Sequence, residues 1–474
     1  MPKDSSILIF FLISFILSSY LAYICYPKYD PKTAVFAGNL SYDLTQTIQR
    51  FALLVIEFVT LNILGYGYAE TSRSIYGKII DGATKELDHK SHNITVRELS
   101  FSDNANYQVI QAIPNEFLQT SKPRPTLFYF HGGGMLFGKP HLMTIATAIN
   151  LRVQVFGVKY RLAPEHKFPA GLDDCSDAIR RILRDYPNKF NVGKFGLFGV
   201  SAGGYLAIAT GMDIDFENDP LIAAAGRKKK NLPNKPEIIM PVVPMTQALR
   251  FDLPSYTDEI KSFPPFRANM IKYWLAYAFG NNSQHNFYNQ AANKILARNW
   301  HWSENILNDH EFQSRVDPEK WIFDDKEQKN FKKYQSNSAR KQSYFKHKNK
   351  INKYGYGNPL PNDFEKLLKN KLYNPGLASE KDLSNFLNNT KKVVIVTSGH
   401  DPLNSDGVIF FSRLKNAKIG KEMHLSLNNL ILEDIEGATH TTLFDSTLIK
   451  PKQGYEFADP YARKVFDYLE DVKT

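Results

Sequence analysis

The chain has 474 residues, of which 43% are hydrophobic and 23% are charged. This composition is ordinary for a globular protein and excludes a mainly disordered chain, a collagen and a multi-span membrane protein. The length is ample for one large α/β domain with a sizeable core. Two cysteines, Cys25 and Cys175, are too few for a disulfide scaffold or a cysteine-based zinc module. We expect Cys175 to be a free, buried thiol.

The net charge of +11 is concentrated in one segment. Residues 320–353 hold eleven Lys or Arg and three acids, so this basic loop carries +8 and the other 440 residues carry +3. Such a local excess is typical of a solvated, partly disordered loop, and contact with anionic lipid headgroups is the alternative. No nucleic-acid-binding motif accompanies the charge, so we expect no nucleic-acid partner.

The N-terminus predicts one membrane anchor. Residues 5–26 carry no charge and as a helix would extend about 33 Å, which is enough to cross a bilayer once. A cleaved signal peptide is the alternative, but the plausible cleavage points place Leu17 or Tyr20 where a small residue is needed. We therefore expect an uncleaved anchor over residues 1–28, followed by an N-terminal helical or cap segment over residues 29–100.

The orientation of the anchor is not set by charge, because positive residues flank it almost equally. Four N-x-S/T sequons follow it, at Asn39, Asn93, Asn281 and Asn388, and these glycosylation candidates are compatible with a lumenal body. The apolar stretch Phe51–Leu64 is too short to span a bilayer and contains a glutamate. That pattern is typical of a core helix or a membrane-surface helix.

Short apolar strands alternate with helical segments through the main domain, residues 101–474. The sequence predicts strands over 107–113, 126–130, 153–158, 195–200, 237–243, 393–397 and 430–435, and helices over 171–184, after the 195–200 strand through 210, 405–416 and 459–470. This alternation indicates a mostly parallel central sheet flanked by helices. Residues from about 249 to 389 do not follow this alternation of strands and helices. We expect this cap insertion, with the N-terminal segment, to cover part of the top of the sheet.

The motif Gly199-Val200-Ser201-Ala202-Gly203 directly follows one predicted strand and opens a small-residue helix. A serine on such a sharp strand-to-helix turn has an exposed hydroxyl, and the flanking glycines give the turn room. A helix that only packs closely on a sheet would also favour glycine and alanine here. Ser201 is the candidate nucleophile.

A histidine and three glycines, His131-Gly132-Gly133-Gly134 (HGGG), follow the predicted strand over 126–130, 70 residues before Ser201. Consecutive glycines allow backbone N–H groups to converge on one substrate oxygen without a Cβ in the way. The N–H groups of Gly132, Gly133 and Ala202 are therefore the candidate oxyanion hole, and a simple glycine loop is the alternative. We expect His131 and Gly134 to support this loop, with the histidine structural and not a base.

A nucleophilic serine needs a base and a residue that orients the base, and these are expected after later strands in the order serine, acid, histidine. Asp401 follows the strand over 393–397, and His440 follows the last strand. We expect Ser201, Asp401 and His440 to form a catalytic triad. The other candidates nearby are Asp406, Glu433, Asp434, Glu436 and His400. Asp406 is expected inside the next helix. The acids at 433, 434 and 436 lie on or just after the last strand, and His400 precedes Asp401 in the chain.

Together these motifs resemble the hormone-sensitive-lipase-like branch of the α/β-hydrolases. Besides HGGG, the matching runs are YRLAPE at 160–165, GVSAGG at 199–204 and Asp401-Pro402-Leu403. The resemblance covers most of the chain apart from the basic loop. The chain departs from the branch at Val200, where aspartate is usual, and at His400, where an aromatic or aliphatic residue is common.

A finer resemblance is to the arylacetamide deacetylase group of that branch, carried by the single anchor, DLPSY at 252–256 and Trp302-Ser303. It implies an α/β-hydrolase fold with a helical cap, and a serine carboxylic ester hydrolase held in the endoplasmic reticulum membrane with a lumenal body. The implied substrates are small lipophilic esters or aryl amides, and no cofactor or metal is expected. The alternatives are a neutral lipid or cholesteryl ester lipase and a catalytically silent hydrolase-fold binding protein. The complete set of serine, aspartate and histidine argues against the silent protein.

Overall fold

The computed structural model describes the chain in several stretches. These are residues 89–101, 105–184, 189–224, 234–251, 253–257, 267–280, 309–316, 362–419, 429–440 and 460–473, with positions 70, 73, 74, 78, 81 and 443. The expected anchor over 1–28, the basic loop over 320–353, Asn39 and Asn281 lie outside the described residues. Within the described stretches no helix is both long and apolar enough to cross a bilayer.

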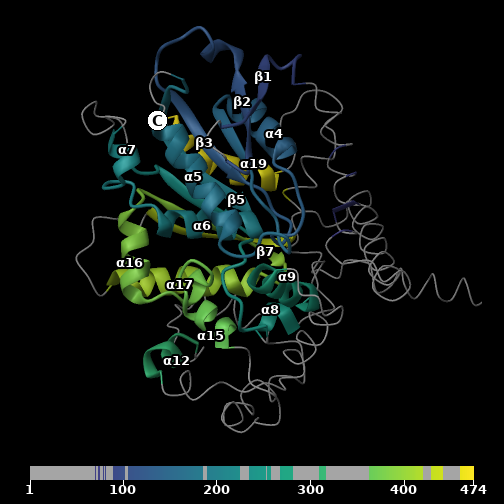
Figure 1. Ribbon diagram of the computed structural model, residues 1–474, viewed down its shortest axis with the longest axis vertical. Coiled ribbons are helices and arrows are strands. Elements are labelled where there is room, and N and C mark those ends of the chain that lie inside the picture. Colours follow the sequence, from purple (N-terminus) through teal and green to yellow (C-terminus); the bar gives the residue numbers. More distant parts are fainter. Residues whose placement is uncertain are drawn as a thin grey trace, which may run out of the picture.

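One eight-stranded sheet forms the centre of the molecule, in the order β1-β2-β4-β3-β5-β6-β7-β8 (Figure 1). The strands are β1 (Ile94–Leu99), β2 (Gln108–Pro114), β3 (Arg124–Phe130), β4 (Gln154–Lys159), β5 (Val192–Val200), β6 (Ile238–Val242), β7 (Val393–His400) and β8 (Leu430–Thr439). β2 pairs antiparallel with β1 and with β4, and every other pair in the sheet is parallel. The predicted α/β fold with a mostly parallel sheet is confirmed.

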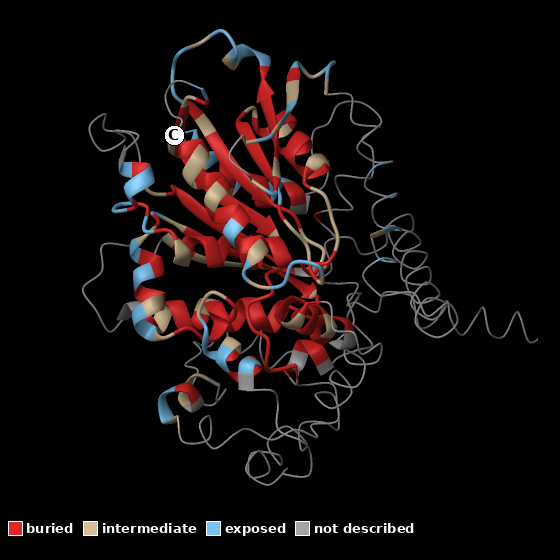
Figure 2. Ribbon diagram, viewed as in Figure 1, coloured by how far each residue is buried: buried red, intermediate tan, exposed pale blue. Residues whose placement is uncertain are grey.

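Helices cover both faces of the sheet, so its inner strands, β2 to β7, are buried along most of their length (Figure 2). One face carries α5 (Ala170–Arg184), α6 (Ala202–Asp213) and α17 (Asn404–Ile419), and the other carries α4 (His141–Leu151) and α19 (Pro460–Leu469). Along β3, Phe128 and Phe130 join the first core while Leu127 and Tyr129 join the second. Coverage on both faces explains why the inner strands are continuously apolar.

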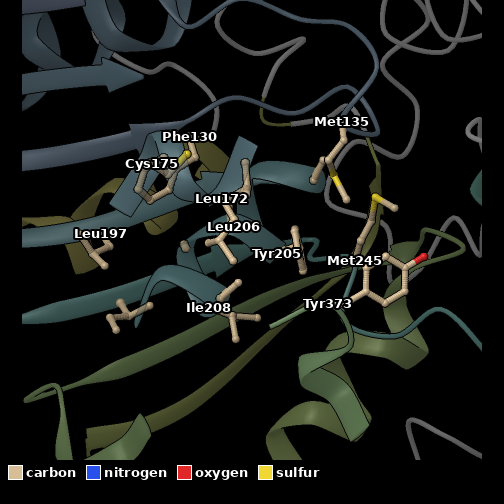
Figure 3. Packing of buried hydrophobic residues seen from close by; sticks show 14 of the residues in the cluster. Phe130, Met135, Leu172, Cys175, Leu197, Tyr205, Leu206, Ile208, Met245 and Tyr373 are labelled. Atoms are coloured by element: carbon tan, nitrogen blue, oxygen red, sulfur yellow. The ribbon is translucent and has the colours of Figure 1, made fainter. Parts of the chain in front are cut away.

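The larger core lies under α5 and α6 and holds the buried cysteine. Cys175 of α5 belongs to this core together with Phe130 of β3 and Leu172 of its own helix (Figure 3). It is a free and fully buried thiol, as predicted, and burial raises the pKa of Cys175 well above its ordinary value. The remaining short elements are η2 (Asn115–Phe117), α7 (Pro220–Ala224) and η8 (Glu470–Val472).

β6 and β7 are neighbours in the sheet, although residues 243–392 separate them in the chain. The described elements of this segment are α8 (Pro254–Thr257), α9 (Arg267–Phe279), α12 (His310–Val316), α15 (Asn362–Lys369), η6 (Pro375–Leu377) and α16 (Glu380–Asn388). The aromatic rings of α9 pack on α6, where Tyr205 and Trp274 lie 5.3 Å apart between ring centroids. α16 packs against α17 through Phe386 and Phe410. The boundaries of the cap insertion stay a prediction.

Gly203 lies where α6 begins against β3, and this close approach is open to a test. A Cβ built on Gly203 would lie 1.9 Å from the carbonyl oxygen of Phe130. We expect Gly203→Ala to displace the start of α6 and to lower the free energy of unfolding by about 1–3 kcal/mol, the usual cost of overpacking. Denaturant unfolding followed by fluorescence measures the loss.

Gly204→Ala is the matched control, because its Cβ would lie 3.1 Å from Pro244, a contact that a small shift relieves. Equal losses for the two variants would contradict the close packing at Gly203.

Candidate active site

Ser201 lies on the tight turn between β5 and α6. Its backbone has φ 59° and ψ −118°, a conformation that side-chain-bearing residues rarely adopt, and the residue is 7% exposed. Its N–H donates to the carbonyl of Val242, at the end of the neighbouring β6, at 2.9 Å. A Cβ on Gly199 would lie 2.2 Å from the carbonyl oxygen of Gly203, so a bulkier turn does not fit. The structure thus shows the strained strand-to-helix turn that the motif predicts.

The glycine loop after β3 lies directly against this turn. A Cβ built on Gly132 would lie 2.9 Å from the carbonyl oxygen of Val200 and 3.4 Å from Cβ of Ser201. Gly133 has φ +113°, which strongly favours glycine. The N–H groups of Leu136 and Phe137 donate to the carbonyl of Gly133 at 2.9 and 3.1 Å, and close the loop on itself. The structure therefore brings the predicted oxyanion loop and the predicted nucleophile together.

His131 supports the glycine loop from behind. Its Nδ1 lies 2.8 Å from the carbonyl oxygen of Gly132, and its ring stacks on Tyr160 with 4.2 Å between centroids. The hydroxyl of Tyr160 donates to the carbonyl of His131 at 2.8 Å. Burial lowers the pKa of His131 to about 4, so the ring is neutral and donates its Nδ1 proton to the loop. This geometry supports the structural role expected for His131.

Asp401 and His440 form a hydrogen-bonded pair at the ends of two adjacent parallel strands. Asp401 follows β7 and His440 follows β8. Nδ1 of His440 lies 2.8 Å from Oδ2 of Asp401, while Oδ1 accepts from the N–H of Leu403 at 2.8 Å. The aspartate side chain is fully buried and the histidine side chain is 9% exposed. The carboxylate is fixed at both oxygens, and it in turn fixes the orientation of the imidazole.

All the predicted site segments lie at one edge of the sheet. The glycine loop follows β3, Ser201 follows β5, Asp401 follows β7 and His440 follows β8, and these strands run parallel. The carboxyl ends of parallel strands form the usual ligand-binding edge of an open α/β sheet. No cluster of three or more His, Cys, Asp or Glu suited to a metal ion occurs among the described residues.

The nearest rival acid, Asp406, is bound to a different part of the molecule. It lies in α17, as predicted, and its Oδ1 accepts from Nε2 of Gln247 at 2.9 Å. Its Oδ2 accepts from the N–H of Thr246 at 3.2 Å. Asp406 is fully buried, and burial raises its pKa to about 7. This carboxyl links α17 to the segment after β6 and bonds to neutral donors there.

Two of the three acids of β8 also have partners elsewhere. Asp434 accepts from the hydroxyl of Thr397 at 2.7 Å and from Nδ2 of Asn404 at 2.8 Å. Glu433 accepts from the hydroxyl of Tyr468 at 2.8 Å. The third acid of β8 is the glutamate at position 436, whose side chain is not among the described ones. The geometry therefore favours Asp401 as the partner of the histidine.

Sequence reasoning missed the side chains that support the acid turn. Ser255 of α8 donates its hydroxyl to the carbonyl of Pro402 at 2.5 Å and accepts from the N–H of Ser405 at 3.2 Å. Asn404 donates Nδ2 to the carbonyl of Ser398 at 3.1 Å. The DLPSY run, which contains Ser255, was a usable signal for the first contact. No local sequence pattern predicted the second contact, between Asn404 and Ser398.

Two of the four glycosylation candidates can be placed. Asn93 is exposed immediately before β1, with φ 55°, and Asn388 is exposed at the last position of α16. Both side chains are accessible, but glycosylation at either position stays a prediction.

The comparisons with known proteins agree with this geometry. A family model described as the α/β hydrolase fold matches residues 127–307. The chain is similar to this family over that stretch, and its fold is that of an α/β-hydrolase. It is similar to arylacetamide deacetylase of Oryctolagus cuniculus, with 29% identity over 341 residues, 69% of this chain and 71% of the relative. For arylacetamide deacetylase of Bos taurus the identity is 26% over 419 residues, 86% and 87% of the two chains.

Similarity also extends to a second named group and to solved structures. Neutral cholesterol ester hydrolase 1 of Mus musculus is 28% identical over 212 residues, 43% of this chain and 48% of the relative. The α/β-hydrolase shares its fold with a bacterial heroin esterase (TM-score 0.50, 17% identity, 84% of this chain and 90% of the other). The esterase of Pyrobaculum calidifontis gives a TM-score of 0.50 at 15% identity, over 89% and 98% of the chains. The predicted resemblance to the arylacetamide deacetylase group is confirmed.

The buried carboxyl of Asp406 makes the stability of the hydrolase depend on pH. Its pKa of about 7 exceeds the ordinary value, so between pH ~4 and ~7 the folded protein keeps a proton that the unfolded chain releases. The free energy of unfolding should therefore fall as the pH rises through this window, by up to about 1.4 kcal/mol per pH unit. Asp406→Asn should remove that slope, because an amide does not ionise.

Denaturant unfolding of both proteins at pH 5, 6, 7 and 8 measures the effect. Above pH ~7 the free energies of unfolding of the wild type and of Asp406→Asn should change in parallel with pH. By then the folded and the unfolded wild type have both released the proton. Parallel curves over the whole range would show that Asp406 does not titrate there.

Proposed function

We propose that this α/β-hydrolase is a serine carboxylic ester hydrolase of the arylacetamide deacetylase type. In this proposal Ser201 is the nucleophile, His440 is the general base and Asp401 orients the base. The observation that carries it is the 2.8 Å hydrogen bond between His440 and Asp401, at the same sheet edge as the strained turn of Ser201. The similarity to arylacetamide deacetylases supports the same class of reaction.

The tautomer of His440 follows from its contact with the acid. Because Nδ1 donates to Asp401, Nε2 is the nitrogen without a proton and can accept one from Ser201. Oγ of Ser201 attacks the substrate carbonyl carbon as this proton moves to Nε2. The imidazolium that forms is stabilised by the buried carboxylate. His440 then gives the proton to the leaving alcohol or amine, and water repeats the sequence to release the acid.

The developing oxyanion would be bound by the N–H groups of Gly132, Gly133 and Ala202. Ala202 is the first residue of α6, so the N-terminal end of that helix adds partial positive charge at this point. Each donor of such a hole typically contributes about 3–4 kcal/mol to the stability of the transition state. The contact between the glycine loop and the turn of Ser201 supports this assignment.

The proposed substrates are lipophilic esters or aryl amides. A neutral lipid or cholesteryl ester is the second candidate, and the similarity to neutral cholesterol ester hydrolase 1 favours it. We also propose that residues 1–28 anchor the enzyme in the endoplasmic reticulum membrane with a lumenal body. The uncharged run of the sequence and the four sequons support this placement. A silent binding protein is disfavoured by the intact pair of Asp401 and His440.

Hydrolysis of p-nitrophenyl esters from acetate to palmitate tests the proposal. The detergent-solubilised wild type should be active, and Ser201→Ala should lose about 10⁴-fold or more in kcat, because the acyl-enzyme cannot form. A preference for short chains would indicate small esters, and a preference for long chains would indicate neutral lipids. A folded wild type no faster than the variant on every ester would contradict the assignment.

Asp401→Asn tests which acid orients the base. The amide cannot hold the imidazole in the required tautomer, so kcat should fall by roughly 10³–10⁴ while KM changes little. Asp406→Asn is the matched control, since Asp406 is equally buried and five residues away but bonds to Gln247 and Thr246. Its kcat at pH 7 should stay within about tenfold of the wild type. The reverse order of losses would identify Asp406 as the acid.

A further inference from the structure

Arg73 of the N-terminal segment binds two loops of the hydrolase domain. Its Nε donates to the carbonyl of Leu136 at 2.7 Å, and its Nη2 donates to the carbonyl of Ala163 at 2.6 Å. Nη1 and Nη2 also meet both carboxylate oxygens of Glu165, at 2.7 and 2.5 Å. These partners lie 63 to 92 residues away in the chain. One planar guanidinium thus makes four hydrogen bonds, to both oxygens of a carboxylate and to two backbone carbonyls, whereas an ammonium group has only three N–H donors.

The first of these partners belongs to the oxyanion loop. Leu136 is 2% exposed, and its N–H donates to the carbonyl of Gly133 at 2.9 Å. Its own carbonyl accepts from Arg73, so both polar groups of Leu136 are bound. The neighbouring Met135 accepts from the N–H of Ala163 at 2.9 Å, and Ala163 also accepts from Arg73. Arg73 therefore bonds to both of the segments that the hydrogen bond between Met135 and Ala163 joins.

A second contact joins the same N-terminal segment to the same loop. Nζ of Lys139 lies 2.7 Å from both carboxylate oxygens of Asp81, eight positions after Arg73. This pair is half-exposed and contributes little stability by itself. It does place a second described residue of the segment against the same loop, at Lys139. The segment therefore contacts the loop at two separate positions, Arg73 and Asp81.

We propose that Arg73 is a positioning residue that holds the glycine loop in its catalytic conformation. The inference rests on the proposed function, because it assigns the N–H groups of Gly132 and Gly133 to the oxyanion. Arg73 does not touch the substrate and acts through Leu136 and Gly133. Donors of an oxyanion hole act mainly in the transition state, so a loosened loop should lower kcat more than it raises KM.

Arg73→Gln tests this role against a matched control, Arg152→Gln. Arg152 also binds a glutamate with two nitrogens, donating to Glu116, and donates Nη1 to the carbonyl of His92 at 2.7 Å. It lies at the carboxyl end of α4, just before β4, at the opposite edge of the sheet from Ser201. The two variants therefore remove similar interactions, but only one removes a contact with the glycine loop.

We expect Arg73→Gln to lower kcat for a p-nitrophenyl ester about 10- to 100-fold, with KM within about threefold of the wild type. Its affinity for a trifluoromethyl ketone, which forms a tetrahedral oxyanion with the serine, should fall in parallel. Arg73→Lys should restore only part of the loss, and Arg152→Gln should change kcat less than twofold. Hydrogen exchange of the peptide over 131–140 should rise in Arg73→Gln but not in Arg152→Gln.

The exchange measurement separates the two proposals, because it does not depend on activity. If the wild type is inactive but hydrogen exchange of the loop is faster in Arg73→Gln, the proposed function is contradicted. The positioning of the loop by Arg73 is then still supported. Unchanged exchange would overturn the positioning role, whatever the change in kcat. Equal losses of kcat in the two arginine variants would also overturn it, because they would reflect a general loss of stability.

Discussion

The contact between the start of α6 and the ends of β3 and β5 is the constraint on which the site depends. For the hydroxyl of Ser201 to project from the end of the sheet, the chain must pass from β5 to α6 within one residue. This tight turn forces the positive φ of Ser201. Such backbone strain costs of order 1–3 kcal/mol and persists only where the surroundings determine it. Here the hydrogen bond to Val242 and the absence of side chains at Gly199 and Gly203 determine it.

The glycine loop and the turn of Asp401 lie outside the sheet and the helices, and side chains bond to their backbone carbonyls. His131 and Tyr160 hold the glycine loop from within the domain, and Arg73 holds it from outside. Ser255 bonds to the turn that carries Asp401. In each case a side chain meets a backbone carbonyl that the sheet or a helix does not use. The sheet therefore brings the loops to one edge, and these bonds fix their conformations.

The hydrogen-bond partner gives chemically similar, buried groups different roles in and near the site. His131 and His440 both use Nδ1 in a hydrogen bond, but His131 meets a carbonyl whereas His440 meets a carboxylate. The full negative charge of the carboxylate stabilises an imidazolium much more than a neutral carbonyl does. Asp401 and Asp406 are both buried, but Asp401 faces the histidine while Asp406 accepts from neutral amide groups. The contrast explains why the raised pKa of Asp406 is a property of stability in this enzyme and does not mark it as the acid of the site.

Local patterns in the sequence determined the fold class and the position of each proposed catalytic group. Apolar runs, the two glycine motifs and the order of serine, acid and histidine each lie within a few consecutive residues. The edge strand β1 was not predicted, since Ile94–Leu99 contains polar and half-exposed residues, and α4 was missed as well. β8 continues to Thr439, beyond the predicted end at 435, because its pairing with β7 resumes after a register shift.

Only the tertiary structure decided which side chains meet. The bond between Asp401 and His440, the contact of Ser255 with the acid turn and the reach of Arg73 to Leu136 join residues that are 39, 147 and 63 positions apart. A sequence pattern records the spacing of residues along one strand or helix. It does not record which strand ends lie side by side, and the order of strands in the sheet sets that.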